Sequence, residues 1–189
     1  MENIILIGYG GHAKSVADCI EREKKYKIIG YTDEEERISR YKYLGTDDIL
    51  EEYFDQGVKN AVIGIGYLGK GQVRQNIYKR LKIIGYSLPI IKDPTAIISD
   101  TAKIGEGSFI GKNAVINADA IIGKAVIVNT MALVEHECIV SDFSHVAVAT
   151  VLCGQVHVGE AAFIGANATI LQGREIKTHQ IVPAGETIR

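Results

Sequence analysis

The sequence has no tryptophan and contains only 3 prolines and 3 cysteines in 189 residues. The odd number of cysteines (Cys19, Cys138 and Cys153) and the absence of a Cys-x-x-Cys spacing argue against a disulfide framework and against a thiolate zinc site. Charged residues make up 23% and the formal net charge is −2, so no general attraction to nucleic acid or to a membrane surface is expected.

Long hydrophobic runs are also missing. No apolar run approaches the roughly 18 residues that are needed to cross a bilayer. Met1 to Asn3 leads straight into a short apolar strand, which does not resemble a signal peptide. These absences together predict a reduced, cytoplasmic protein.

Glycine, by contrast, is abundant, with 20 residues. High glycine without proline enrichment is typical of a repeat with many tight turns. From Ile98 onward, every sixth residue is aliphatic: Ile98, Ile104, Ile110, Ile116, Ile122, Val128, Val134, Val140, Val146, Leu152, Val158, Ile164, Ile170, Ile176, Val182 and Ile188. A small residue recurs four positions after most of them, and Gly or Asn often follows directly, which suits corners with unusual backbone angles.

A period of six is the hexapeptide signature of a parallel β-helix, in which three hexads make one triangular coil of about 18 residues. We therefore expect a left-handed parallel β-helix domain over residues 94–189. One face carries charged residues at the third hexad position, namely Glu106, Lys124, Asp142 and Glu160. The other two faces have fewer charged residues there. A prism with two drier sides favours a homotrimer, the simplest symmetric way to pack those sides against copies of the chain.

Residues 1–93 have a different pattern, which predicts a small Rossmann-like α/β domain. Strands are expected at 4–7, 27–31, 61–65 and 87–91, and helices at 15–25, 47–56 and 71–84. The alternation of strand and helix predicts a parallel sheet.

The loop after the first strand, Gly8 to Ala13, fits the pattern G-x-G-x-x-A. Such a loop lets backbone N–H groups and a helix N-terminus approach a phosphate. Asp33 follows the second strand, where an acidic residue commonly takes ribose hydroxyls. About four strands are too few for a full dinucleotide fold, so a mononucleotide diphosphate is favoured over NAD. A glycine turn without a ligand is the alternative.

His136 and Glu137 form the main candidate for chemistry. His136 occupies the third hexad position, and its neighbours one coil away are Ala118 and Gly154, small residues that would leave open space around the imidazole. Histidine is the natural general base near neutral pH, and a nearby carboxylate favours the imidazolium that forms. An exposed surface histidine is the alternative.

His145 lies in an outward apolar stripe between Ile127 and Phe163. It is either a hydrogen-bonded interface histidine or a residue that contacts a ligand. His157 and His179 are expected on the surface, and Cys138 is expected to pack inward.

The loop GYGGHAK, Asp33 and the segment NTMALVEHECIVSDFSHVAVATVLCGQVHVGEAAFIGANATI resemble the bacterial sialic-acid O-acyltransferase family. That family includes N-acetyltransferases that act on nucleotide-linked amino sugars. The likeness covers nearly the whole chain. It implies a homotrimer that moves an acetyl group from acetyl-CoA to an amino or hydroxyl group of a sugar, with no metal.

The resemblance also implies roles for individual residues. His136 would be the general base and Glu137 would raise its basicity. Acetyl-CoA would be bound by His145, Gly154 and Ala166, with the Gly154 N–H as oxyanion donor. The sugar nucleotide would be held by Gly10, Gly11 and His12, with Asp33, Glu34 and Gly66 on the nucleoside side.

The C-terminal segment REIKTHQIVPAGETIR departs from this family, whose members usually continue with more hexads and a G-x-P-A-K-like tail. Leu171, Lys177 and Pro183 stand where earlier hexads often have glycine. The resemblance therefore does not predict which residues bind the adenine end of CoA. Two other functions stay open. One is a nucleotide-sugar-binding scaffold without catalysis. The other is a metal-dependent hydrolase resembling the γ-type carbonic anhydrases, with imidazole ligands from His136, His145 and His157 of neighbouring subunits.

Overall fold

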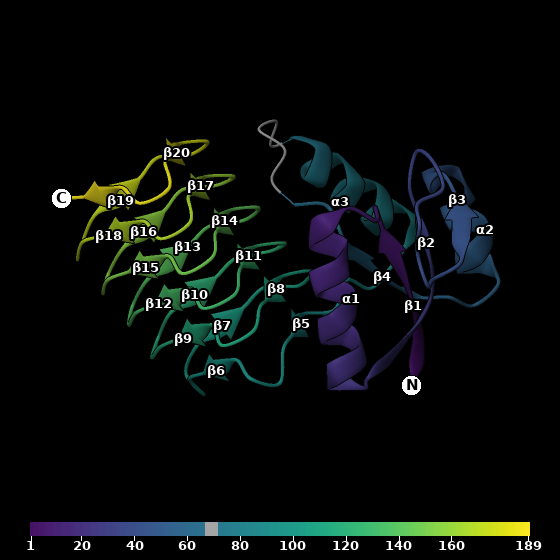
Figure 1. Cartoon of the computed structure of the whole chain (residues 1–189), viewed down its shortest axis with the longest axis horizontal. Coiled ribbons are helices and arrows are strands. Elements are labelled where there is room, and N and C mark those ends of the chain that lie inside the picture. The colour runs from purple at the N-terminus through teal and green to yellow at the C-terminus, as the bar shows by residue number, and fades with distance from the viewer. Residues whose placement is uncertain (67–71) are drawn as a thin grey trace. The chain divides into compact units, whose positions relative to one another are not determined.

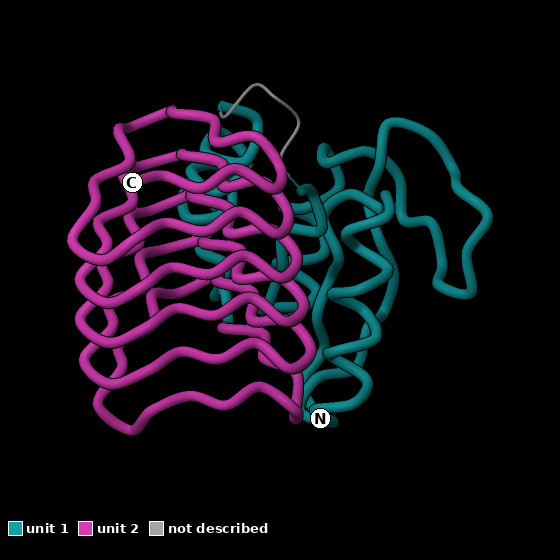
Figure 2. Tube along the Cα trace, turned by 60° about the vertical axis from the view of Figure 1, so that its left-hand side comes forward, with its two compact units in different colours: residues 1–89 teal, residues 90–189 magenta. Residues whose placement is uncertain are grey.

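The computed structural model describes residues 1–66 and 72–189, which separate into two compact units, Met1–Pro89 and Ile90–Arg189 (Figure 2). This division falls slightly before the expected boundary between residues 93 and 94. Strand β5 (Ile91–Lys92) already pairs with β8 (Phe109–Ile110) of the second unit, so the coils begin before Pro94. The expected fold class, a small α/β domain followed by a left-handed parallel β-helix, is confirmed.

The first unit contains a sheet of four parallel strands in the order β3-β2-β1-β4 (Figure 1). The strands are β1 (Glu2–Ile7), β2 (Tyr26–Thr32), β3 (Tyr43–Gly45) and β4 (Asn60–Ile63). Residues Ile4 to Ile7 are buried almost completely, as expected for a central parallel strand that is covered on both faces.

The helices of this unit are α1 (Gly11–Glu23), the short 3₁₀ helix η1 (Asp47–Ile49), α2 (Leu50–Asp55) and α3 (Gln72–Ile84). Helix α1 begins earlier than the expected residue 15, directly at the glycine loop. The helix expected over 47–56 is split into a 3₁₀ turn and a short α-helix. Gly71, the expected first residue of the third helix, lies outside the described residues. None of the helices in the described part of the chain is both long and apolar enough to cross a membrane.

The fourth strand of the sheet is not the expected one. Residues 87–91 were expected to join the sheet, but Ser87 makes only an isolated bridge with Asn60. Pro89 has no N–H to donate to a ladder, which explains why no strand continues there. The fourth strand is β3, which lies at the opposite edge of the sheet, where its Tyr43 pairs with Tyr31 of β2.

The second unit is a stack of coils made of two-residue strands in three parallel sheets (Figures 1 and 2). One sheet contains Glu175–Ile176 (β19), His157–Val158 (β16), Ile139–Val140 (β13), Ile121–Ile122 (β10) and Lys103–Ile104 (β7). The next contains Ile181–Val182 (β20), Phe163–Ile164 (β17), His145–Val146 (β14), Ile127–Val128 (β11), β8 and β5. The third contains Thr187–Ile188 (β21), Thr169–Ile170 (β18), Val151–Leu152 (β15), Leu133–Val134 (β12), Val115–Ile116 (β9) and Ile97–Ile98 (β6).

The predicted aliphatic column fills the axis of this prism. Its members from Ile110 to Val182 are at most 2% exposed and pack in one cluster with small residues such as Ala132 and Cys138. The corners of the coils use left-handed backbone at non-glycine residues, including Glu137 (φ 58°) and Gln155 (φ 62°). Because successive coils are 18 residues apart, each corner residue lies beside its counterpart in the next coil, as the pairing of Ile121 with Ile139 shows.

Candidate active site

His136 and Glu137 lie in the turn between β12 and β13. The Nδ1 atom of His136 is 3.1 Å from Oε2 of Glu137, and the two side chains are 47% and 53% exposed. A carboxylate at Nδ1 favours a proton on that nitrogen, which leaves the lone pair of Nε2 available. The arrangement can therefore take a proton from a group that approaches Nε2.

The imidazole lies against the backbone of Gly154, its counterpart one coil later. A Cβ on Gly154 would lie 2.5 Å from both Cε1 and Nε2 of His136. On the other side, the Ala118 carbonyl accepts the Glu137 N–H at 2.9 Å. The coil register thus places His136 between Ala118 and Gly154, as the sequence predicts, but the ring fills the space beside Gly154 instead of leaving it open.

Further hydrogen bonds hold this turn from both neighbouring coils. Gln155 donates from Nε2 to Oε2 of Glu137 at 3.2 Å and from its backbone N–H to the His136 carbonyl at 2.9 Å. Oε2 of Glu135 accepts from the His136 N–H at 3.2 Å and from Nδ2 of Asn117 at 2.9 Å. Gln155, Glu135 and Asn117 are not among the site residues predicted from the sequence. The spacing of 18 residues between Glu137 and Gln155 was the signal that could have revealed Gln155.

The two remaining candidates for acetyl-CoA binding belong to other parts of the coil. His145 begins β14 and is 8% exposed, with its ring edge-on to Phe163 at a centroid distance of 5.1 Å. Its Nε2 lies 3.4 Å from Nδ2 of Asn129. Ala166 is an exposed residue in the turn between β17 and β18. The structure thus joins His136, Glu137 and Gly154 directly, and places His145 and Ala166 on neighbouring stretches of the coil.

The other histidines and cysteines of the coil have simpler surroundings. His157 and His179 are exposed, as expected. Cys138 is buried, and its thiol donates to the Cys153 carbonyl at 3.1 Å. Across residues 1–66 and 72–189, no group of three or more His, Cys, Asp or Glu side chains is placed to hold a metal ion.

In the first unit, the glycine loop connects β1 to α1. Gly8 has a left-handed φ of 80°, and a Cβ there would lie 2.6 Å from Cγ1 of Ile65, so only glycine fits. Gly10 and Gly11 differ, because a Cβ on either would have no atom within 4 Å. Both are exposed in front of the α1 N-terminus, where backbone N–H groups can receive an anion.

Asp33 ties the end of β2 to this loop. Its Oδ2 accepts the Tyr9 N–H at 3.0 Å, and its Oδ1 accepts the Glu34 N–H at 2.8 Å and Nη2 of Arg37 at 3.4 Å. Burial works to raise the pKa of Asp33, but these hydrogen bonds together outweigh it and hold the pKa below its ordinary value. Asp33 is therefore an ionised carboxylate at neutral pH that fixes the position of the loop.

His12 packs beside Gly66 at the start of α1. A Cβ on Gly66 would lie 3.4 Å from the His12 Cβ. Burial, with a smaller effect of the Arg74 charge, lowers the pKa of His12 to about 4. Arg74 is itself 6% exposed on α3, and burial lowers its pKa to about 10. At neutral pH, His12 is therefore an uncharged imidazole near a buried cation.

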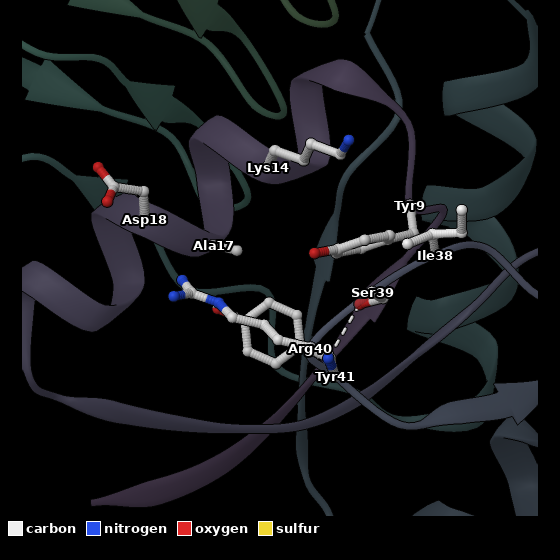
Figure 3. Close-up of a pocket in the computed structure, with 8 residues that line it drawn as sticks. All are labelled: Tyr9, Lys14, Ala17, Asp18, Ile38, Ser39, Arg40 and Tyr41. Atoms are coloured by element: carbon white, nitrogen blue, oxygen red, sulfur yellow. Dashed lines mark hydrogen bonds between the residues drawn. The ribbon is translucent and has the colours of Figure 1, made fainter.

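Two pockets adjoin the loop and share Tyr9, Lys14 and Ile38. One, of about 450 Å³, is lined by Tyr9, Gly10, Gly11, Lys14, Glu35, Glu36, Arg37 and Ile38. The other, of about 430 Å³, is lined by Tyr9, Lys14, Ala17, Asp18, Ile38, Ser39, Arg40 and Tyr41 (Figure 3). Figure 3 shows Lys14 and Asp18 extending from α1, and Arg40 and Tyr41 from the segment that follows β2. Lys14 and Arg37 are not among the site residues predicted from the sequence, although Lys14 ends the segment GYGGHAK.

Comparison with known proteins gives two family matches. The model described as "PglD N-terminal domain" matches residues 3–81, and the one described as "Bacterial transferase hexapeptide (six repeats)" matches residues 101–136. The chain is 31% identical to PerB from Caulobacter crescentus, solved in complex with CoA and GDP-perosamine, with a TM-score of 0.95 over 100% of this chain and 89% of that one. Another structure from the same organism, 30% identical and with the same coverage and a TM-score of 0.94, is described as a mutant of perosamine N-acetyltransferase.

A third similar structure is the acetyltransferase domain of PglB from Neisseria gonorrhoeae in complex with acetyl coenzyme A. It is 27% identical, with a TM-score of 0.90 over 99% of this chain and 92% of that one. The chain thus spans about nine-tenths of the length of each of these proteins.

Proposed function

We propose a function for this chain from its family. The chain belongs to the hexapeptide-repeat acyltransferase family and has a PglD-type N-terminal domain. The proposed reaction is the transfer of the acetyl group of acetyl-CoA to the amino group of a nucleotide-linked amino sugar. The relatives carry CoA, acetyl-CoA or GDP-perosamine. The observation in this chain that carries the proposal is the contact of His136 with both Glu137 and the Gly154 backbone, because it sets up a base in an exposed corner.

The reaction needs one base and one donor for the developing oxyanion. The acceptor amine attacks the thioester carbonyl, His136 takes the proton that the amine loses, the C–N bond forms and the C–S bond breaks. The proton held by His136 then neutralises the departing thiolate. General-base help of this kind contributes about 10²- to 10⁴-fold to the rate.

The backbone N–H of Gly154 is our candidate for the oxyanion donor. Within the described residues it donates no hydrogen bond, whereas the N–H groups of Ala118 and His136, at the same corner of the two preceding coils, are bonded to Asn117 Oδ1 and Glu135 Oε2. The contact with the imidazole is what distinguishes Gly154. We propose that His145 and Ala166 contact acetyl-CoA.

We propose that the first unit binds the nucleotide part of the acceptor. The open space at Gly10 and Gly11, with Lys14 and Arg37 lining the same pocket, suits a diphosphate. His12 would add an uncharged donor. Asp33, Glu34 and Gly66 would lie on the nucleoside side, with Asp33 also fixing the loop.

We also propose that the enzyme is a cytoplasmic homotrimer. Three free cysteines suit a reducing compartment. The coil carries exposed apolar residues that an association of copies would cover: Ile97, Ile121, Ile139, Val148, Leu171 and Ile181. A stable monomer in sedimentation velocity would contradict the trimer.

The test is thiol release from acetyl-CoA in the presence of GDP- and UDP-linked amino sugars. His136→Ala should lower kcat by at least about 100-fold, while His179→Ala, which changes an exposed histidine outside the site, should retain the wild-type rate. A His136→Ala rate equal to wild type would remove the base assignment. Calorimetric binding of the nucleotide sugar without thiol release by the wild type would favour a non-catalytic scaffold instead.

A further inference from the structure

One oxygen of Glu137 has two partners. Oε2 lies 3.1 Å from Nδ1 of His136 and 3.2 Å from Nε2 of Gln155. We propose that Gln155 is a positioning residue for acyl transfer: it holds the Glu137 carboxylate in place and thereby orients His136. This inference rests on the proposed role of His136 as general base.

Glu137 needs such an anchor because it is exposed. Its side chain is 53% exposed, and an exposed charge pair contributes little by itself. Fixing a glutamate side chain costs rotamer entropy of similar or larger size. The contact with His136 alone is therefore too weak to keep the carboxylate in one rotamer, and a second donor on the same oxygen adds the missing restraint.

Gln155 is well placed to supply that restraint. Its own backbone N–H bonds to the His136 carbonyl at 2.9 Å, so Gln155 is fixed to one member of the pair and donates to the other. The 18-residue coil puts Asp119, Glu137, Gln155 and Gly173 at equivalent left-handed corners. Gly173 has no side chain that could compete for the Gln155 amide at this corner.

Among the carboxylates of this corner and its neighbours, Glu137 is the one that contacts the imidazole ring in the described residues. Oε2 of Glu135 is engaged by the His136 N–H and by Asn117, and Asp119 occupies the preceding corner of the column. The Gln155 amide does not titrate, so it orients Glu137 in the same way at every pH at which the enzyme works. A carboxylate held at Nδ1 keeps Nε2 as the proton acceptor.

The test compares Gln155→Met, which keeps the size of the side chain and removes the donor, with Gln155→Glu, which places a second carboxylate beside Glu137. His179→Met is the matched control, because His179 is an exposed residue at a corner with nearly the same φ of 59°. The readouts are kcat, KM for both substrates, the pH profile of kcat/KM and Tm.

For Gln155→Met we expect kcat to fall about tenfold, the lower end of the effect known for residues that orient metal-binding histidines, with KM for both substrates and Tm equal to the control. The acid limb of the pH profile should move to lower pH, because a Glu137 carboxylate without its Gln155 anchor spends less time beside the imidazolium and stabilises it less. In Gln155→Glu the limb should move to higher pH, because added negative charge retains that proton. General damage to the fold would not shift the limb in opposite directions.

His136→Ala is run in the same assay so that the two proposals are judged separately. If His136→Ala retains the wild-type rate, the proposed base is wrong. If His136→Ala is inactive but Gln155→Met matches His179→Met in kcat and in pH profile, the positioning role alone is wrong. A fall in kcat accompanied by lower Tm and an unmoved acid limb would also overturn it.

Discussion

The imidazole of His136 occupies the space that a side chain on Gly154 would need. A Cβ on Gly154 would lie 2.5 Å from Cε1 and from Nε2 of the ring, far inside the roughly 3.5–4.0 Å of normal carbon contacts. Gly154 is not among the residues with left-handed backbone, so the backbone itself would accept alanine. The position of the ring, rather than a turn, therefore requires glycine here.

Gly154→Ala should displace the imidazole. We expect kcat to fall at least about tenfold, since the ring must leave its contact with Glu137, and stability to fall by about 1 kcal/mol at most, because the ring is the far end of an exposed side chain that can move. Chemical denaturation of a double-mutant cycle checks the cause. In a His136→Ala background the space is empty, so the added methyl should cost little stability. An equal cost in both backgrounds would show that the ring is not what the methyl meets.

Gly11→Ala separates ligand binding from folding in the first unit. Gly11 is the first residue of α1, and a Cβ there meets no atom of the chain within 4 Å. Alanine in place of a helical glycine is favourable by up to about 1 kcal/mol, so Tm should stay constant or rise. If a diphosphate lies against this backbone, KM for the nucleotide sugar should rise about tenfold or more, since one tenfold step corresponds to about 1.4 kcal/mol of binding.

The control for that variant is Ser15→Ala, an exposed position in the next turn of the same helix. It should leave both KM values unchanged. An unchanged KM for the nucleotide sugar in Gly11→Ala would mean that the open space at the loop does not receive the phosphates.

The β-helix could be predicted almost entirely from the sequence, because the hydrophobic period of six corresponds directly to the coil geometry. The aliphatic residue at every sixth position from Ile110 to Val182 is buried in one column. The edge strand of the first unit could not. Tyr43 to Gly45 is three residues long and becomes a strand through pairing with β2, whereas 87–91 has the apolar composition of a strand but contains Pro89. The hydrophobic pattern of a short segment does not predict whether that segment pairs at the edge of a sheet.

The candidate site was predictable to the extent that it depends on register. The 18-residue spacing alone predicts that Gly154 lies beside His136. Contacts that depend on rotamers were not visible: the bond from Gln155 to Glu137, and the bond from the Tyr9 N–H to Asp33, which makes Asp33 part of the loop. The sequence suggested Asp33 only as a ribose ligand, because an acidic residue after the second strand has that role in the motif.

Asp33→Asn should weaken the fold in a pH-dependent manner. The pKa of Asp33 is lowered in the folded state, so its contribution is fully present above the unfolded value of about 4 and is lost as pH falls below it. The asparagine variant loses charged acceptors for the Tyr9 N–H and for Arg37, at a cost of about 1–2 kcal/mol at pH 7.

Thermal unfolding at pH 7 and near pH 2.5 measures this effect, with Asp119→Asn at an exposed corner as the control. The gap in Tm between wild type and Asp33→Asn should narrow at the acid end. A gap of equal size at both pH values would mean that the ionised carboxylate is not what stabilises the loop.

His12 should govern a second, higher pH window. Its pKa in the folded protein is about 4, while the unfolded chain binds the proton near 6.5. Between these values the unfolded state holds more protons, so stability falls as pH drops from 6.5 to 4, by up to about 3 kcal/mol for this shift. His12→Gln should remove that slope from the plot of unfolding free energy against pH across the window.

Arg74→Met tests what lowers the pKa of His12, because burial is the larger effect and the Arg74 charge the smaller one. NMR should show that the His12 ring of Arg74→Met titrates above about 4 but still below 6.5. A midpoint of 6.5 in the wild type would contradict the buried, uncharged imidazole. The proposed hydrogen bond from His12 to the diphosphate depends on that uncharged imidazole.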